Sequence, residues 1–406
     1  MKLYFQLAWR NLWRNKRRTL IATTSVLFAV ILSLITRSMQ HGYYDYMIDS
    51  AVRLYTGYIQ IHSKGYWENR SLDESMVLSE SMIQKIRSFP KITTVTPRLE
   101  TYSLISFQNA TKITPVFGID PVLEDSIIDL KKKIVKGEYL SINSEGMLIA
   151  EGLAKLLKVD VGDSVVIYGQ GYHGVTAAAQ IPIQGIVKFI LPALNNATVY
   201  LSLPYAQWLY SAPERITSLS IMINNIGELE DTKEFLAMHF SDKYEVMDWA
   251  ELMPELVQGI EMDNASGIIM LFILYVVIGF GIFGTVMTMT AERIKEFGIL
   301  VSVGMKKGKL ILVAILETMF VSFIGAISGI LVSIPLLYYF HVNPIYLTGE
   351  TAEAILAFGF EPILPFSVKP GIFFAQVSVV FLIAMLSAIY PITVIRKLEP
   401  VKAMRK

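Results

Sequence analysis

Cysteine is absent from the 406 residues, and charged side chains are scarce at 17%, whereas soluble proteins carry about 25%. Without cysteine the chain has no disulfide, no thiolate metal ligand and no cysteine nucleophile. The five histidines are scattered with no pair at metal-ligand spacing, which argues against a zinc enzyme. Because 53% of the residues are hydrophobic and the mean hydropathy is +0.47, part of the chain must be surrounded by lipid.

A phosphate-binding loop is missing as well. The nearest fragment, residues 304–309, is one residue too short and lacks the hydroxyl, so we expect neither ATP hydrolysis nor another catalytic site in this chain. Residues 279–284 match the G-x-G-x-x-G dinucleotide fingerprint, but they lie inside an apolar run rather than after a strand. Small residues in such a run let neighbouring helices approach closely. We assign this packing role to Gly279, Gly281, Gly284, Gly325 and Gly329.

Four stretches are long and apolar enough to cross a bilayer core, which requires roughly 20 helical residues. They cover residues 19–40 (TM1), 264–290 (TM2), 310–340 (TM3) and 371–395 (TM4). The first is longer than the apolar core of a signal peptide, so we expect a retained anchor. The predicted fold class is a membrane α-helical protein with four transmembrane helices and a large α+β extracytoplasmic domain between helices one and two.

The α+β domain is predicted for residues 41–263, where short β-branched and aromatic runs alternate with helical segments. Strands are expected at 57–62, 165–168, 181–187 and 218–223, and helices at 81–88, 151–157, 204–210 and 226–239. The length suffices for two subdomains, with a candidate boundary near residues 131–137. We expect the domain to be built from two sequence-distant halves, because its ends must return to neighbouring helices.

Lysine and arginine are concentrated in three segments, which we therefore place in the cytoplasm. These are residues 1–18, which carry six basic residues and no acid, residues 291–309, and the tail 396–406. By contrast, residues 341–370 carry Lys369 alone against three glutamates. We expect a multi-pass protein of the bacterial inner membrane, with both termini cytoplasmic and with residues 41–263 and 341–370 in the periplasm.

Residues 1–18 carry a further pattern besides their charge. Phe5, Ala8, Trp9, Leu12 and Trp13 recur at helical spacing, with polar and basic residues around the other side. This pattern predicts an amphipathic helix that lies in the lipid headgroup region before the chain enters the membrane.

Several motifs indicate a family. Residues 291–305, AERIKEFGILVSVGM, resemble the A-E-R-x-x-E-x-G-I-L-x-x-x-G signature of permeases with an FtsX-like membrane domain. Residues 7–19 are similar to that family's opening L-A-x-R-N-L-x-R-x-K-x-R-T, and residues 391–405 to its closing proline and A-L-R pattern. Residues 149–163 resemble a recurring element of the external domain in MacB-like members. As a separate chain without a fused ATPase, the sequence looks most like the lipoprotein-releasing subunits LolC and LolE.

The resemblance implies the permease subunit of a bacterial ABC transporter of the mechanotransmission type, extracting or releasing lipoproteins from the inner membrane. Alternatives within the family are MacB-like efflux or antimicrobial-peptide export, and a non-transporting regulator of a periplasmic hydrolase. The implied partners are an ABC ATPase dimer that binds ATP and Mg, a second permease subunit in a homodimer or heterodimer, membrane lipids, and a lipoprotein or other amphiphilic substrate. We expect no cofactor, no metal and no nucleic acid on this chain.

By the same resemblance, residues 291–309 form a cytoplasmic coupling helix in which charged residues contact the ATPase and Phe297, Ile299 and Leu300 anchor the segment. The coupling residues are Glu292, Arg293, Lys295, Glu296, Phe297 and Gly298. Two paired subunits would enclose an apolar cavity that is open to lipid. Its expected walls are Leu27, Val30, Ile31 and Leu34 of helix one, and Ile269, Phe272, Ile273, Val276 and Phe280 of helix two.

Glu317 is the single charged residue of the third stretch. It lies about two turns, roughly 10 Å, from the end that we place in the cytoplasm. From there it can pair with a basic residue or cap a helix. A direct role in transport is the alternative, although a proton relay usually needs several such groups.

Overall fold

The computed structural model describes residues 2–14, 16–189, 192–358, 360–400 and 403. The chain divides into two compact units. The membrane unit comprises Met1–Tyr46, Gly259–Tyr346 and Ile363–Lys406, and the globular unit comprises Met47–Gln258 and Leu347–Pro362. Most of the predicted tail after residue 400 lies outside the described residues.

The membrane unit contains the four helices that are long and apolar enough to span a membrane, as predicted. They are α2 (Lys16–Ala51), α11 (Pro254–Glu292), α13 (Lys307–Val342), and α15 (Pro370–Ser387) followed by α16 (Ile389–Arg396). With 36 and 39 residues, α2 and α11 are longer than the roughly 20 residues that a bilayer core needs. The apolar stretches predicted at 19–40 and 264–290 therefore end inside helices whose polar ends continue into the globular unit's sequence.

Close packing joins α13 to α2 in the membrane unit. A Cβ atom on Gly325 would lie 2.7 Å from the Cβ of Val26, and one on Gly329 would lie 2.8 Å from the Cβ of Val30. Both distances are too short for real carbon atoms, so glycine at these two positions is what lets the helices touch. On α11, in contrast, a Cβ on Gly281 or Gly284 meets nothing within 4 Å in the described chain.

Shorter elements complete the membrane unit: α1 (Lys2–Arg14), α12 (Ile294–Ser302), β13 (Ile345–Tyr346) and β14 (Ile363–Leu364). The strands β13 and β14 pair with each other. Between them, α14 (Glu350–Phe358) belongs to the globular unit and contacts α7 (Pro192–Asn195) there. The segment 341–370, predicted as a simple loop, thus supplies a helix to the globular unit.

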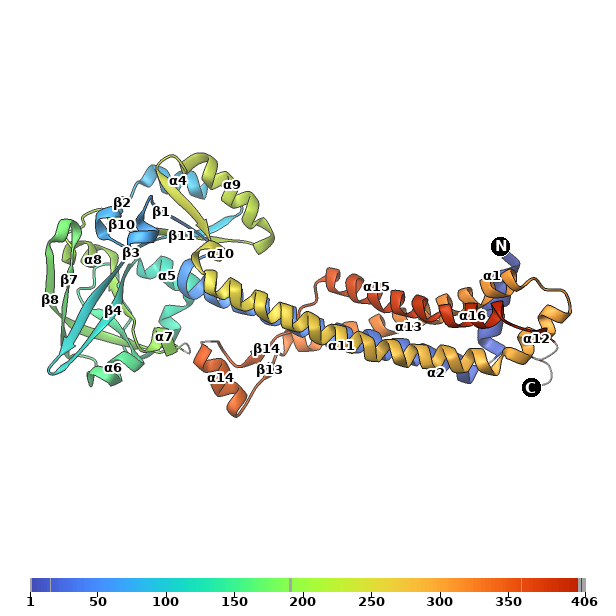
Figure 1. Cartoon of the computed structure of the whole chain (residues 1–406). Coiled ribbons are helices and arrows are strands. Elements are labelled where there is room, and N and C mark those ends of the chain that lie inside the picture. Colours follow the sequence, from blue (N-terminus) through green and yellow to red (C-terminus); the bar gives the residue numbers. More distant parts are fainter. Residues whose placement is uncertain (1, 15, 190–191, 359, 401–402, 404–406) are drawn as a thin grey trace. The chain divides into compact units, whose positions relative to one another are not determined.

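One part of the globular unit is a βαββαβ arrangement built from both ends of its sequence. Its strands follow the spatial order β12-β1-β11-β3, and all three pairings are antiparallel. The helices α4 and α9 lie on the same side of these strands in Figure 1, and Phe89 stacks on Phe235 at 4.2 Å between ring centroids. The elements are β1 (Ile59–Ser63), α4 (Glu80–Arg87), β3 (Ile92–Phe107), β11 (Ser218–Ile223), α9 (Leu229–Phe240) and β12 (Tyr244–Asp248).

The other part is a ring of six strands, in which β3 pairs with β4, β4 with β9, β9 with β6, β6 with β8, β8 with β7, and β7 again with β3. The strands β5 (Ile134–Gly137) and β8 also pair, and the helices α5 (Pro121–Ile128), α6 (Glu151–Leu157) and α8 (Leu203–Leu209) accompany the ring. The remaining ring strands are β4 (Ala110–Ile119), β6 (Met147–Ala150), β7 (Ser164–Gln170), β8 (Thr176–Val187) and β9 (Val199–Ser202).

The two parts share β3 and one continuous hydrophobic core. The chain enters the ring along β3 and leaves it at β11, so the division does not fall near residues 131–137. That segment forms a short 3₁₀ turn and β5, inside the ring part. Small elements fill the rest: α3 (Tyr66–Asn69), β2 (Met76–Val77), β10 (Arg215–Ile216) and α10 (Trp249–Leu252).

Candidate functional site

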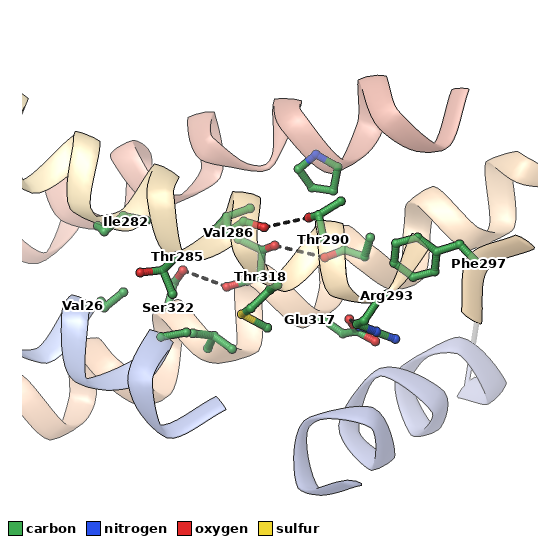
Figure 2. A pocket seen from close by; sticks show the side chains of 15 residues that line it. Val26, Ile282, Thr285, Val286, Thr290, Arg293, Phe297, Glu317, Thr318 and Ser322 are labelled. Atoms are coloured by element: carbon green, nitrogen blue, oxygen red, sulfur yellow. Dashed lines mark hydrogen bonds and ion pairs between the residues drawn. The ribbon is translucent and has the colours of Figure 1, made fainter. Parts of the chain in front are cut away.

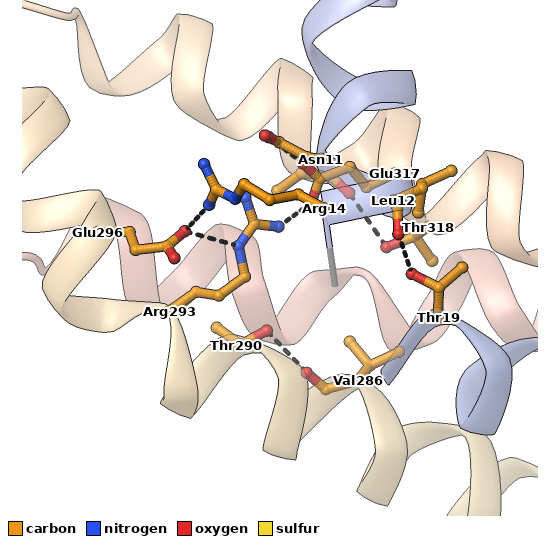
Figure 3. Close-up of polar contacts among 11 residues, drawn as sticks. Asn11, Leu12, Arg14, Thr19, Val286, Thr290, Arg293, Glu296, Glu317 and Thr318 are labelled. Carbon is orange, nitrogen blue, oxygen red and sulfur yellow. Dashed lines mark hydrogen bonds and ion pairs between the residues drawn. The ribbon is translucent and has the colours of Figure 1, made fainter. Parts of the chain in front are cut away.

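A buried carboxylate lies at the end of the membrane unit that carries α1 and α12. Glu317 of α13 is 5% exposed, and each of its oxygens has a partner. Oε1 accepts a hydrogen bond from Nδ2 of Asn11 at 2.7 Å, and Oε2 pairs with Nη1 of Arg293. A carboxylate removed from water is tolerated only when it is paired and hydrogen-bonded. Both conditions are met here, so Glu317 forms a structural ion pair (Figure 3).

Arg293 occupies the break between α11 and α12. Its amide donates to the carbonyl of Thr290 at 3.1 Å, and its own carbonyl accepts from the amide of Phe297 at 2.9 Å, which starts α12. The guanidinium lies 5.1 Å from the centroid of the Phe297 ring, and its Nε is 3.5 Å from a carboxylate oxygen of Glu296. With its side chain 10% exposed, Arg293 serves two carboxylates at once, which its five donors permit.

Two further ion pairs tie α1 and α2 to the same segment. Arg14 of α1 pairs with Glu296, and Arg18 of α2 pairs with Glu292, with Nε 2.6 Å from Oε2. These pairs are partly exposed, and exposed pairs contribute only about 0–1 kcal/mol each. The pair of Glu317 with Arg293 is therefore the member of this network that is best shielded from solvent.

The helix α12 has one buried face and one exposed face. Phe297 and Gly298 are buried, and Phe297 packs in a cluster with residues of α13 and α16, including Leu310 and Ile395. The helix ends at Ser302, and two residues further on Gly304 has a φ of +105°, a conformation that favours glycine. The opposite face carries the exposed residues Lys295, Ile299 and Leu300, and Val303, which directly follows the helix, is exposed as well.

This arrangement differs from the predicted one. Ile299 and Leu300, expected to anchor the segment, are 49% and 41% exposed, because the buried stripe of α12 follows Ile294, Phe297 and Val301 at helical spacing. Arg293, expected to contact a partner, is buried by Glu317. Glu292 and Glu296 are about 40% exposed but already hold arginines of this chain.

A small cavity of about 40 Å³ lies beside the buried pair, among α2, α11, α13 and α16 (Figure 2). It has room for about two or three water molecules. The hydroxyls of Thr290 and Thr318 donate to carbonyls one turn back on their own helices, at 2.7 and 3.1 Å, so their lone pairs remain as acceptors. The side chains of Arg293 and Glu317 thus border a space that is not fully packed.

The predicted walls of a membrane cavity divide into two groups. On α11, all five residues are exposed by 40% to 73%, namely Ile269, Phe272, Ile273, Val276 and Phe280. On α2, Val30 and Leu34 are fully buried and Leu27 and Ile31 are half-buried. The face of α2 that was predicted to line the cavity instead packs on Gly329 and its neighbours in α13. The exposed large residues in the middle of α2 are Phe28 and Leu32.

The prediction from the sequence missed the roles of Asn11, Arg14 and Arg18. Asn11 and Arg14 are three residues apart, so they lie on the same face of α1, turned away from the exposed Trp9 and Trp13. In the sequence, the polar residues at this spacing next to the apolar Ala8 and Leu12 could have indicated a polar contact on this side of α1. On the other face, Phe5 and Trp9 contact Phe320 of α13, with ring centroids 5.2 and 5.6 Å apart.

In the part of the chain that the structure describes, four helices are long and apolar enough to span a membrane, an α+β domain follows the first of them, and a segment held by ion pairs lies between the second and the third. Residues 268–400 match the family model described as FtsX-like permease C-terminal. These residues therefore carry an FtsX-like permease domain, and the chain is similar to ABC transporter permeases of the FtsX/MacB type.

Relatives of two kinds are similar to it. The lipoprotein-releasing system transmembrane protein LolC of Xylella fastidiosa is 19% identical over 328 residues, which cover 78% of each chain. The macrolide export ATP-binding/permease protein MacB of Pasteurella multocida is 21% identical over 353 residues, covering 81% of this chain and 51% of MacB. Among solved structures, the periplasmic region of MacB from Actinobacillus actinomycetemcomitans matches 50% of this chain and 92% of that one, with 16% identity and a TM-score of 0.34.

Proposed function

We propose that this chain is the permease subunit of an ABC transporter that is driven by a separate ATPase dimer and releases lipoproteins from the inner membrane. The observation that carries the first half is the exposed face of α12. The exposed apolar side chains of Ile299, Leu300 and Val303 lie beside Lys295. Such an exposed apolar patch with a polar rim is typical of a protein docking surface. The ATPase, rather than this chain, would bind ATP and Mg.

The charge distribution supports the orientation that this proposal requires. Arginines and lysines are concentrated in residues 1–18, 291–309 and 396–406. Short basic segments stay in the cytoplasm, where an ATPase reaches α12. The globular unit then lies in the periplasm. Movement of α12 acts on Glu317 through Arg293, and the adjoining end of α11 is tied to α2 by the pair of Glu292 with Arg18. The helices α2 and α11 continue into the sequence of the globular unit.

The substrate class rests on the LolC relatives and on the apolar faces of the spans. The exposed residues of α11 carry no charge, and with Phe28 and Leu32 of α2 they offer hydrocarbon surface to lipid or to acyl chains. Extraction of a lipid anchor costs about 0.8 kcal/mol per CH₂ that leaves the bilayer. A second permease subunit, identical or different, would complete an apolar chamber that receives the acyl chains and so lowers this cost.

Docking of the ATPase is tested with Val303→Asp, which places a charge on the apolar residue that directly follows α12 and is 84% exposed. We expect loss of the ATPase from the affinity-purified complex. Val122→Asp in the globular unit is the matched control, because Val122 is a similarly exposed valine, 76% exposed, in α5. An intact complex with Val303→Asp would refute docking at this face.

The substrate is tested by depletion and by reconstitution. We expect lipoproteins to accumulate in the inner membrane when the chain is depleted, and ATP-dependent release from the purified complex. The second candidate is efflux, which the MacB relative favours. Normal lipoprotein localisation together with increased macrolide sensitivity would select efflux instead.

A further inference from the structure

Glu317 connects two helices that are far apart in the sequence. Asn11 of α1 donates to one carboxylate oxygen at 2.7 Å, and Arg293 at the start of α12 pairs with the other. The two donors are 282 residues apart and reach the carboxylate from different elements. The carboxylate is therefore held between α1 and α12.

The backbone of α1 is fixed around Asn11. Ala8 is fully buried and Leu12 is 3% exposed, and α1 packs along α13. The carbonyl of Leu12 also accepts a hydrogen bond from the hydroxyl of Thr19 of α2 at 2.7 Å. The short Asn11 side chain thus delivers its amide from a defined position, and a neutral donor suits a carboxylate that already has a cationic partner.

The Glu317 carboxylate holds the side chain of Arg293 in place through the ion pair, and the carbonyl of Arg293 accepts the first hydrogen bond of α12. A carboxylate that rotates toward another partner would release the guanidinium and loosen the packing of Phe297 beneath it. The second link from α1, between Arg14 and Glu296, is 57% and 40% exposed at its two side chains. Such a pair contributes little by itself, so the buried path through Glu317 carries more of the coupling.

We propose that Asn11 is a positioning residue: through Glu317 and Arg293 it fixes the orientation of α12, which makes the amphipathic helix α1 a working part of the coupling site. This inference rests on the proposed function for the role of α12 as the ATPase contact. It assigns to α1 the control of how the exposed face of α12 is presented.

The test uses the full chain in lipid nanodiscs with one engineered cysteine, because the natural sequence has none. Val301 of α12 is partly buried and packs against the cluster around Phe297, so Val301→Cys reacts faster with a water-soluble maleimide when α12 loosens. Asn11→Leu keeps the size but removes the donor. We expect it to raise the reaction rate about tenfold, the value of one hydrogen bond to a charged group. Asn11→Gln, which restores an amide donor, should return the rate toward that of the natural residue.

Two controls separate positioning from simple packing. Leu12→Ala weakens the packing of α1 but leaves the donor in place, so its rate should rise less than that of Asn11→Leu. In a Glu317→Gln background, Asn11→Leu should add little, because both changes act through one carboxylate. A larger effect of Leu12→Ala, or full additivity with Glu317→Gln, would overturn the proposal. The assay contains no ATPase, so either outcome leaves the proposed function to be judged by the docking and release experiments.

Discussion

Removing Glu317 alone is the perturbation with the largest expected effect on the membrane unit. Glu317→Leu leaves the guanidinium of Arg293 buried, with its side chain 10% exposed. Loss of one partner from a buried ion pair costs about 3–5 kcal/mol. Arg293 keeps a second carboxylate, since Glu296 lies 3.5 Å from its Nε. We therefore expect the lower end, about 3 kcal/mol, which is roughly a hundredfold change in the folding equilibrium.

Replacing both partners should behave differently. Glu317→Leu combined with Arg293→Met removes the buried charges together, and such replacements are often neutral or stabilising. We expect the double variant to fold nearly as well as the natural chain, yet to lose ATP-dependent substrate release, because α12 is no longer held to α13 by charge. The single variant isolates stability, and the double variant isolates coupling.

The assay is unfolding of the reconstituted chain by SDS in mixed micelles, followed by tryptophan fluorescence, with release activity measured separately. A single Glu317→Leu variant that is as stable as the natural chain would show that the buried pair is not the hub of this site. A double variant that folds and also retains full release activity would show that the pair has no role in coupling.

Three further predictions concern other parts of the chain. Thiol labelling of Lys64→Cys from outside intact cells, together with protection of Lys295→Cys, is expected from the proposed topology, and the reverse pattern would exclude it. Gly329→Val should destabilise the membrane unit by about 1–3 kcal/mol through overpacking. Gly281→Val should be tolerated in a single chain, because its Cβ meets open space. Equal effects of the two variants in the same SDS titration would refute the helix packing described. Burial, and next the charge of Arg70, lower the pKa of His62 from 6.5 to about 4. As the pH falls, His62 is therefore protonated at a higher pH in the unfolded chain than in the folded chain. The globular unit should therefore lose up to about 3 kcal/mol as pH falls between these values, and a His62→Gln variant with unchanged pH dependence in urea unfolding would contradict this.

Sequence alone was sufficient where a single local property decides the structure. The four spans follow from apolar length, because lipid leaves no other way to satisfy the backbone. Residues 151–157 and 218–223 were predicted as a helix and a strand, and they form α6 and β11, since their periodicity agrees with their burial.

Pairings between distant residues were not predictable in this way. The ring of strands closes only because β7 pairs with both β3 and β8, and no local pattern specifies such a partner. Likewise, the charges around residue 293 look like a solvated surface in the sequence. The side chain of Arg293 is inside because Glu317 lies 24 residues further along and Asn11 comes from α1.

Under the proposed function, α12 is firmly held within the chain and also presents an apolar face to the ATPase. Arg293 and Glu296 are held by partners within the chain. Ile299, Leu300 and Val303 are exposed. Covering the exposed halves of three such side chains would release about 3 kcal/mol. A surface that is already fixed before binding loses little conformational entropy when its partner docks. The ion pairs thus orient the helix, while its apolar residues remain exposed for the proposed partner. A basic loop that kept its charges on the surface would have offered neither a fixed geometry nor a desolvated contact through which a displacement of the partner reaches α13.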